Sequence, residues 1–506
     1  MTATRTETVT TTRTRGKLGV ASITFMTIAA SAPLTVLAGG VTTMYGVTGV
    51  LGVPLAFILL GIVVVIFSVG YAAMSRYITN AGAFYTYVSR GINREAGVGT
   101  SIVALIAYNS VQLAVYGLLG FTVSATLSTA FGWSLPWWIR VLICVAIVAI
   151  MGINRVDFSV KVIATFVALE SLVVIVYDIV SFAVAPESVS AAPIDPSNLF
   201  VVGIGAVLAF GFVSFMGFES AAIYSEEARD PKRTVARATY LGVSIMAVFY
   251  GISAWAMAVG EGPSKIVGEA AKSGPDLMFV FLGGHVGAIF VDLAHVLFIT
   301  SMFAVVVSFH NIVARYFFSL GREGVLPPVL LKVRNRNGTP YIASLTQTGL
   351  AAVVVIAFAI ADAGWTPPEG LPAELFPVLT MFAWLGQTAG VGLVLLLLVT
   401  AVAIFGFFRR ERHSESAWSR TVSPLISAGV FFVIFILTLV NFNVLLGQEE
   451  SNALTFVLPG ILIVPSVAAV FWGAHLKKSR PDVYERIGYG YDIEGAPRLT
   501  VNDTDE

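Results

Sequence analysis

The sequence is poor in charge and in cysteine. Only 12% of its 506 residues are charged, and 57% are apolar, whereas charged residues make up about 25% of a typical soluble domain. A chain of this composition needs lipid rather than water around most of its surface. Cys144 is the only cysteine, which excludes an internal disulfide. The net charge of zero provides no basic excess for a nucleic-acid partner.

Several functional signatures are also missing. No Gly-rich loop ends in Gly-Lys-Ser/Thr, which argues against ATP drive within this chain, and no paired His and Cys set has metal-ligand spacing. The loops show no filter-like repeat, which disfavours a channel. The loops expected outside hold scattered acids with His285 as their one His or Cys partner, which disfavours a membrane enzyme. We therefore predict a non-enzyme without cofactor or metal, and keep channel and membrane enzyme as alternatives.

Long apolar runs are what the sequence has in abundance. A helix of about 20 apolar residues crosses a bilayer. Twelve segments are read as such helices, at 18–46, 49–75, 96–131, 137–153, 160–185, 198–225, 237–260, 286–320, 340–361, 374–407, 422–446 and 452–475. The sequence thus predicts an all-α polytopic membrane protein. Its expected parts are a disordered cytoplasmic tail, a core of helices 1–10, helices 11–12 and a cytoplasmic C-terminal tail, at 1–17, 18–407, 408–475 and 476–506.

The distribution of basic residues predicts the orientation. Cytoplasmic loops of membrane proteins carry an excess of Lys and Arg. With the N-terminus in the cytoplasm and twelve crossings, 27 of the 30 Lys and Arg residues fall inside. The three expected outside are Arg140, Lys265 and Lys272. Both termini are therefore expected to be cytoplasmic.

Two of the predicted helices contain interruptions. Helix 1 carries small residues followed by Pro33, which lacks an N–H and breaks the hydrogen-bond ladder. Helix 6 carries Gly217, which permits an unwound turn, and Glu219, which places a carboxyl inside the span. Helices 1 and 6 hold matching positions in a five-plus-five inverted repeat, where midplane breaks form binding sites for small solutes. An ordinary kink in each helix is the alternative.

Several motifs resemble one family of membrane proteins. Residues 215–220 (FMGFES) and 225–233 (SEEARDPKR) are similar to helix 6 of the amino acid–polyamine–organocation permeases and to the loop after it. Residues 71–87, 311–327 and 339–340 resemble three further parts of that family. The resemblance implies a LeuT-like core of ten helices in two inverted halves. It also implies a secondary transporter of the plasma (inner) membrane that moves amino acids or related amines by alternating access, as a symporter or an exchanger.

The resemblance also implies a site where helix 1 breaks. Ala30, Ser31 and Ala32 would offer backbone N–H groups to a substrate carboxylate, next to Pro33. The family usually has Gly-Ser-Gly at this place. The two alanines in this chain leave a break plausible but limit how closely a substrate can approach the backbone, so the substrate could differ from those of the best-known members.

Helix 6 would form the opposite wall of that site. By resemblance, Phe215 and Met216 would flank the substrate and offer carbonyl groups to its amine, and Gly217 would form the unwound turn. Val213 lies where some members with cationic substrates place an aromatic residue. A valine there argues against a guanidinium substrate, which prefers an aromatic face.

Ionisable and amide groups inside the predicted spans are candidates for ion coupling. Such groups are costly in lipid and functional by default. Glu219 is read either as a proton-binding or gating group or as a structural hydrogen-bond acceptor. Glu170 in helix 5 could titrate, could bind a cation such as Na⁺ together with Ser308 of helix 8, or could stay neutral. Asn109 and Gln112 share a face of helix 3 and either line the pathway or bond across helices.

Overall fold

The structure, a computed structural model, describes residues 18–78, 83–132, 135–154, 160–219, 221, 228–334, 338–410, 414–448 and 450–489. The predicted N-terminal tail (1–17), most of the predicted C-terminal tail (490–506) and residues 220 and 225–227 of the family motifs lie outside these ranges. Regular structure in the described part is helical. A single isolated parallel bridge joins Leu18 to Ala228, and the N–H of Arg229 donates to the Leu18 carbonyl at 3.0 Å.

The described residues from Val20 to Val213 form eight α-helices and three short 3₁₀ or π segments. In order, they are α1 (Val20–Ser31), η1 (Thr35–Val41), α2 (Thr42–Thr48), α3 (Val53–Met74), α4 (Ala83–Gly91), α5 (Arg94–Phe131), α6 (Trp137–Asn154), α7 (Val160–Val184), η2 (Ala192–Ile194), η3 (Pro196–Asn198) and α8 (Ile204–Val213).

The remaining elements continue the helical pattern to the end of the described chain. They are α10 (Pro231–Glu261), α11 (Ile266–Ser273), η5 (Gly274–Asp276), α12 (Leu277–His285), α13 (Ala288–Glu323), η6 (Pro328–Leu331), α14 (Tyr341–Asp362), η7 (Ala373–Leu375), η8 (Val378–Phe382), α15 (Ala383–Arg410), η9 (Trp418–Val422), α16 (Ser423–Val440), α17 (Phe442–Leu445), α18 (Ala453–Ser479) and α19 (Pro481–Arg486).

Local signals in the sequence set the ends of the longest helices. The Asn93 side chain accepts a hydrogen bond from the Ala96 N–H at 2.7 Å and so caps the start of α5. Gly132 is the C-cap residue that follows α5, and Gly324 is the C-cap residue that follows α13. Both glycines adopt left-handed φ angles of 67° and 81°, a conformation that terminates helices and that glycine adopts without a steric penalty.

Eleven helices of the described chain are long and apolar enough to cross a membrane. Each of them corresponds to one of the twelve predicted spans. The one predicted span without such a helix is 198–225, of which the described part contains only the 10-residue helix α8. This helix is shorter than a bilayer because the chain leaves the α-helical conformation after Val213.

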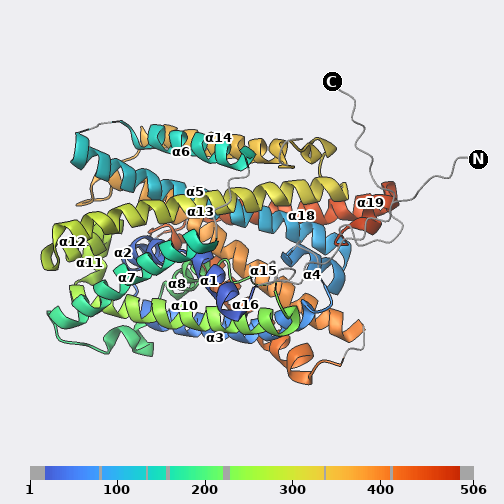
Figure 1. Cartoon of the computed structure of the whole chain (residues 1–506), viewed down its shortest axis with the longest axis horizontal. Helices are drawn as coiled ribbons and strands as arrows, with labels where there is room; N and C mark the ends of the chain where they lie inside the picture. Colours follow the sequence, from blue (N-terminus) through green and yellow to red (C-terminus); the bar gives the residue numbers. More distant parts are fainter. Residues whose placement is uncertain are drawn as a thin grey trace, which may run out of the picture.

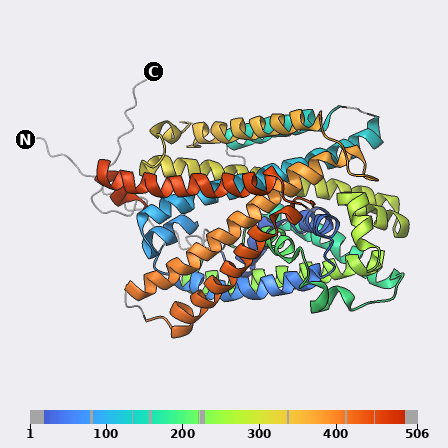
Figure 2. The same ribbon diagram turned by 180° about the vertical axis from the view of Figure 1, so that it is seen from behind.

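The helices lie roughly along the long axis of the molecule and form layers. In Figure 1, α6 and α14 pair along one side, α3 and α10 pair along the opposite side, and α5 and α13 run between them. The labels of the short helices α1 and α8 fall in the middle of the bundle. Figure 2 shows α15 and α16 crossing the bundle obliquely on its other face. The two broken segments are therefore enclosed by longer helices.

Large apolar side chains cover the outer faces of the bundle. Ile360 on α14 is 72% exposed and Phe471 on α18 is 70% exposed. Exposed apolar surface of this extent is unfavourable in water and normal for helices in contact with lipid. The chain is therefore a multi-pass membrane protein.

The C-terminal helix α19 is docked on the bundle at the end where α4 also lies (Figure 1). Val483 and Ile487 are fully buried there. The Tyr484 hydroxyl donates to the Glu95 carboxylate at 2.8 Å, and Lys477 forms an ion pair with the other oxygen of Glu95 at 3.0 Å. The buried Glu323 at the end of α13 accepts hydrogen bonds from the Tyr85 hydroxyl and the Gly488 N–H. Residues 477–488 are thus joined to α5 and α13.

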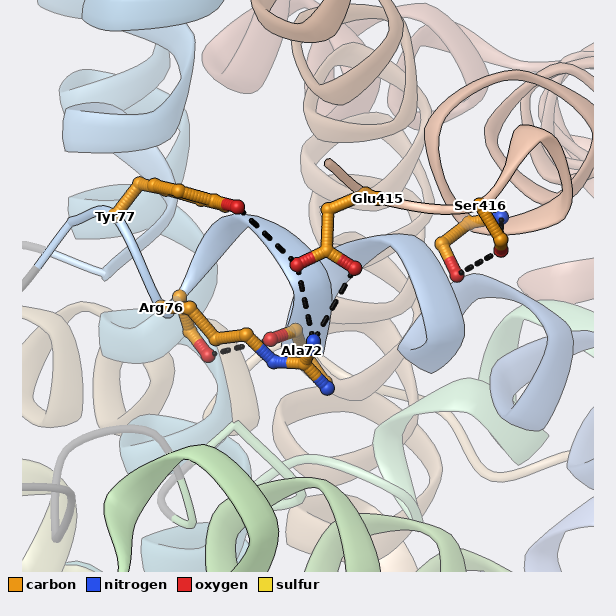
Figure 3. A network of polar contacts seen from close by, with 7 residues as sticks. Ala72, Arg76, Tyr77, Glu415 and Ser416 are labelled. Atoms are coloured by element: carbon orange, nitrogen blue, oxygen red, sulfur yellow. Dashed lines mark hydrogen bonds and ion pairs between the residues drawn. The ribbon is translucent and has the colours of Figure 1, made fainter. Parts of the chain in front are cut away.

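A polar network joins the end of α3 to the segment after α15 (Figure 3). Arg76 donates from one guanidinium nitrogen to both oxygens of Glu415, at 3.0 and 3.2 Å, and the Tyr77 hydroxyl donates to the same carboxylate at 3.3 Å. Partial burial, together with the charge of Glu415, raises the pKa of the Tyr77 phenol. This network ties helices α15 and α16 to the core at their connecting loop.

Candidate functional site

Predicted helix 1, which consists of α1, η1 and α2, breaks at Ala32. The α-helix α1 ends at Ser31, and Ala32 adopts a left-handed conformation with φ 51° and ψ 78°. The Ala32 N–H turns back to the Ala29 carbonyl at 3.2 Å. Pro33 follows and cannot donate to the ladder, and the chain then continues as the π-helical segment η1. The predicted break in helix 1 is confirmed, with Ala32 rather than Pro33 carrying the unusual backbone angles.

Predicted helix 6, the span that contains α8, breaks directly after α8. Residues 214–219 form a series of turns in which the N–H groups of Ser214, Phe215 and Met216 donate three residues back. Gly217 has φ 105°, a region that side chains rarely allow. A Cβ atom at Gly217 would lie only 2.6 Å from the Ala30 Cβ. The two breaks therefore face each other, and the methyl group of Ala30 fills the space opposite Gly217.

A buried carboxyl group lies at each break. One oxygen of Glu219 accepts from the Gly217 N–H at 3.0 Å, and the other accepts from the Tyr108 hydroxyl of α5 at 2.7 Å. The carboxyl of Glu170 on α7 lies close to the Leu34 N–H of helix 1. Glu170 also accepts from the Ser301 hydroxyl of α13 at 2.8 Å. Buried N–H groups need partners, so Glu219 holds the unwound turn of helix 6 in place.

A first cavity, of about 60 Å³, lies between the two breaks. Helix 1 contributes Ala30 and Ser31 to its wall, and helix 6 contributes Val213, Ser214 and Met216. The remaining wall is made by α5, η1, the end of α8, α13, η8 and α15, through Val111, Ala114, Val115, Thr35, Val36, Gly40, Phe210, Val305, Phe309, Phe382 and Gly386. We call this space the central cavity. The two breaks and the elements packed around them form its wall.

A second, larger cavity of about 290 Å³ lies beside it, between α1, α7 and α13. Its wall includes Glu170, Thr300 and Ser301, and the exposed Ser308. We call it the side cavity. Ala30 and Val305 line both cavities, so the two spaces are neighbours. A hydrogen-bond chain from Thr35 through Ser301 to Glu170, with oxygen distances of 3.0 and 2.8 Å, also connects them.

The structure brings together part of the predicted site. Ala30, Ser31, Val213 and Met216 line the central cavity, and Ala30, Ala32, Glu170 and Ser308 line the side cavity. The other predicted residues lie outside both linings. These are Pro33, Asn109, Phe215, Gly217 and Glu219.

Two of these outlying residues have other contacts. Phe215 is fully buried and packs against Phe57, with ring centroids 6.3 Å apart. Asn109 is buried, and its amide donates to the Leu105 carbonyl one turn earlier at 2.9 Å. Its neighbour Gln112 accepts a hydrogen bond from Gln347 of α14, so this face of α5 bonds across helices.

Sequence reasoning missed the α5 residues that point to the site. Tyr108, Val111 and Val115 are three and four positions apart and therefore share one helix face. Val111 and Val115 line the central cavity, and Tyr108 bonds Glu219. The spacing of these residues was visible in the sequence. In an apolar helix, however, almost every face carries such residues, so the spacing alone could not identify the face toward the site.

The fold is similar to that of solved transporters. The crystal structure of an Eremococcus coleocola manganese transporter, bound to an aromatic bis-isothiourea substituted compound, matches 90% of this chain and 94% of its own, with a TM-score of 0.55 and 14% sequence identity. At this identity the similarity concerns the fold alone. Together with the membrane-spanning helices and the relatives that follow, it defines the class: the chain is a multi-pass membrane transporter.

The family follows from the sequence comparison. The model of the amino acid permease family matches residues 22–483, and the chain belongs to this family. It is 25% identical to the gamma-aminobutyric acid permease of Escherichia coli over 84% of this chain and 87% of that protein. It is 24% identical to the branched-chain amino acid permease of Lactococcus lactis over 74% of this chain and 79% of that protein. The resemblance inferred from the motifs is confirmed.

Proposed function

We propose that this chain moves amino acids or related amines across the plasma (inner) membrane by alternating access, as a symporter or exchanger. In this proposal predicted helix 6 also crosses the membrane, so that the chain crosses it twelve times. The first ten form a LeuT-like five-plus-five inverted repeat, and both termini are cytoplasmic. The observation that carries the proposal is the pair of facing breaks in helices 1 and 6 beside the central cavity. Breaks of this kind hold substrates in secondary transporters.

The substrate in this proposal lies in the central cavity, with its charged head group at the breaks. Its carboxylate lies against helix 1 at Ala30 and Ser31, and its amine lies against the unwound part of helix 6 at Met216, the predicted residues at the breaks that line this cavity. Backbone dipoles at helix ends stabilise charges of both signs without adding a charged side chain. The permease relatives named above are consistent with this assignment.

We expect counterflow of amino acids through the purified protein. Vesicles that contain the protein and are preloaded with an unlabelled amino acid should accumulate the same labelled amino acid transiently, because a carrier exchanges solutes at one alternating site. Protein-free vesicles are the control. Equilibration without a transient overshoot would indicate a channel, and silence across all amino acids and amines would overturn the proposed substrate class.

The coupling ion in this proposal is H⁺, with Na⁺ as the alternative. Glu170 is the candidate that lines a cavity next to the break in helix 1, because it lies close to the Leu34 N–H and accepts from Ser301 of α13. Its negative form attracts the Leu34 N–H. Protonation removes that charge and weakens the attraction. A proton on Glu170 would thus loosen the unwound segment that contacts the substrate.

Replacing Glu170 by glutamine should therefore uncouple transport from the proton gradient. The Glu170→Gln variant keeps the size of the side chain but cannot titrate, so we expect counterflow to persist while gradient-driven accumulation falls at least tenfold. Glu374→Gln, an exposed position in η7, is the matched control. Uptake would be measured between pH 5 and 8, with and without Na⁺. A variant with normal accumulation and an unchanged pH profile would contradict the role of Glu170.

A further inference from the structure

We propose that the substrate is an amino acid with a short, uncharged, aliphatic side chain, rather than a cationic amino acid or a diamine. This proposal rests on the proposed function, because it assumes that the head group of the substrate lies at the two breaks. It concerns the part of the central cavity that remains for the side chain.

Much of the cavity wall is aliphatic. Helix α5 presents Val111, Ala114 and Val115 on one face, and α13 adds Val305, while Val213 comes from the end of α8. The lining side chains of this cavity are apolar or carry only a hydroxyl group. Each methylene moved from water into such a wall favours binding about fourfold. An ammonium or guanidinium group in the same place loses its water without gaining a charged partner, which is strongly unfavourable.

Two aromatic rings limit the length of the side chain. Phe210 and Phe382 both line the cavity, and their ring centroids are 5.5 Å apart in an edge-to-face arrangement. Phe210 is also tightly enclosed. A Cβ atom at Gly386 would lie 2.9 Å from its ring, and one at Gly40 would lie 3.6 Å from it. A ring wedged between two glycines has little room to move aside, so the cavity, with its volume of about 60 Å³, accepts a short side chain.

The acids near the breaks are already engaged. Glu219 accepts from Gly217 and Tyr108 and lies outside the lining of the central cavity. Glu170 lies in the side cavity, behind Ala30 and Val305. A diamine would have to pass these two residues to pair its second ammonium with Glu170. This alternative predicts that Glu170→Gln weakens the binding of diamines selectively.

Competition experiments in vesicles would test the proposal. Counterflow of labelled alanine would be challenged with glycine, valine, phenylalanine, lysine, arginine and putrescine. We expect valine to compete at concentrations at least tenfold lower than lysine, arginine or putrescine. Counterflow of lysine or putrescine that exceeds that of alanine and valine would overturn this inference and leave the proposed function intact. Absence of counterflow with every compound would instead overturn the proposed function.

Two variants of α5 would connect the selectivity to the cavity. Ala114→Leu fills part of the cavity. The apparent affinity for valine divided by that for glycine should therefore fall at least tenfold. Val115→Ala enlarges it and should raise the affinity for phenylalanine relative to alanine. Ala357→Leu, at an exposed position of α14, makes the same substitution on the lipid face and should leave both ratios unchanged. Because Val115→Ala adds no bulk, it provides a test even if Ala114→Leu does not fold. Unchanged ratios in a folded α5 variant would overturn the proposal.

Discussion

Replacing Gly217 by alanine should reduce transport at least tenfold and lower the thermal stability of the protein. Two effects add at this position. The φ angle of 105° is strained for any residue with a side chain, which costs about 1–2 kcal/mol. The new methyl group would also lie 2.6 Å from the Ala30 Cβ, and overpacking of this kind costs about 1–3 kcal/mol. Uptake in vesicles and the unfolding temperature of the purified protein would measure both.

A compensating substitution separates the two effects. Ala30→Gly removes the methyl group that the new side chain at position 217 would strike, so the double variant should recover part of the stability lost in Gly217→Ala. It should not recover all of it, because the strained φ angle remains. Gly349→Ala in α14, where a Cβ meets no atom within 4 Å, is the matched control and should have no such effect. A Gly217→Ala protein with normal uptake and stability would show that helix 6 does not need its unwound turn.

Replacing Glu219 by glutamine should abolish pH-dependent uptake while the protein is still made and inserted. The carboxylate accepts from two donors, Tyr108 and Gly217. A glutamine offers one acceptor oxygen and one NH₂ group, so its oxygen can accept from only one of these donors, and the Tyr108 hydroxyl would have to turn and accept from the NH₂ group. The loss of a charge-assisted hydrogen bond to a buried donor costs about 1.5–3 kcal/mol. We expect uptake to fall at least tenfold, measured across pH 5–8 in vesicles.

The pH profile and a second variant separate a structural role of Glu219 from a role in coupling. Tyr108→Phe removes one donor and keeps the bond to Gly217, so it should lower uptake less than Glu219→Gln and preserve the pH dependence. If Glu219→Gln retains the wild-type pH profile at reduced uptake, Glu219 only holds helix 6 in place. In that case Glu170 would remain the sole candidate of the two acids for proton binding.

The sequence predicted the architecture well because lipid imposes a simple rule. Every crossing needs a long apolar run, and eleven of the twelve predicted runs correspond to helices of sufficient length. The breaks were predictable for a similar reason, since Pro33 and Gly217 are local helix breakers. The left-handed residue itself was not predictable, because an alanine at position 32 carries no signal for φ 51°.

The candidate site was predictable only in part, because its walls come from distant segments. The residues of helices 1 and 6 follow from the breaks themselves. Val111, Phe210 and Phe382 reach the same cavity from α5, α8 and η8, and their convergence depends on how the helices pack. The same holds for the acids. The sequence singled out Glu170 and Glu219 as buried groups, but that Glu219 would bond the Gly217 N–H and Glu170 would lie beside Leu34 is a consequence of tertiary structure.

The docked C-terminal helix α19 determines where the chain can be cut without loss of buried contacts. Val483 and Ile487 belong to the packed interior, and Glu95 and Glu323 take partners from residues 477–488. An affinity tag or fluorescent protein fused in place of the residues after Ser479 would therefore expose apolar surface and remove Tyr484 and Gly488, which bond these two acids. The same fusion placed beyond Tyr489 would leave every one of these contacts in place.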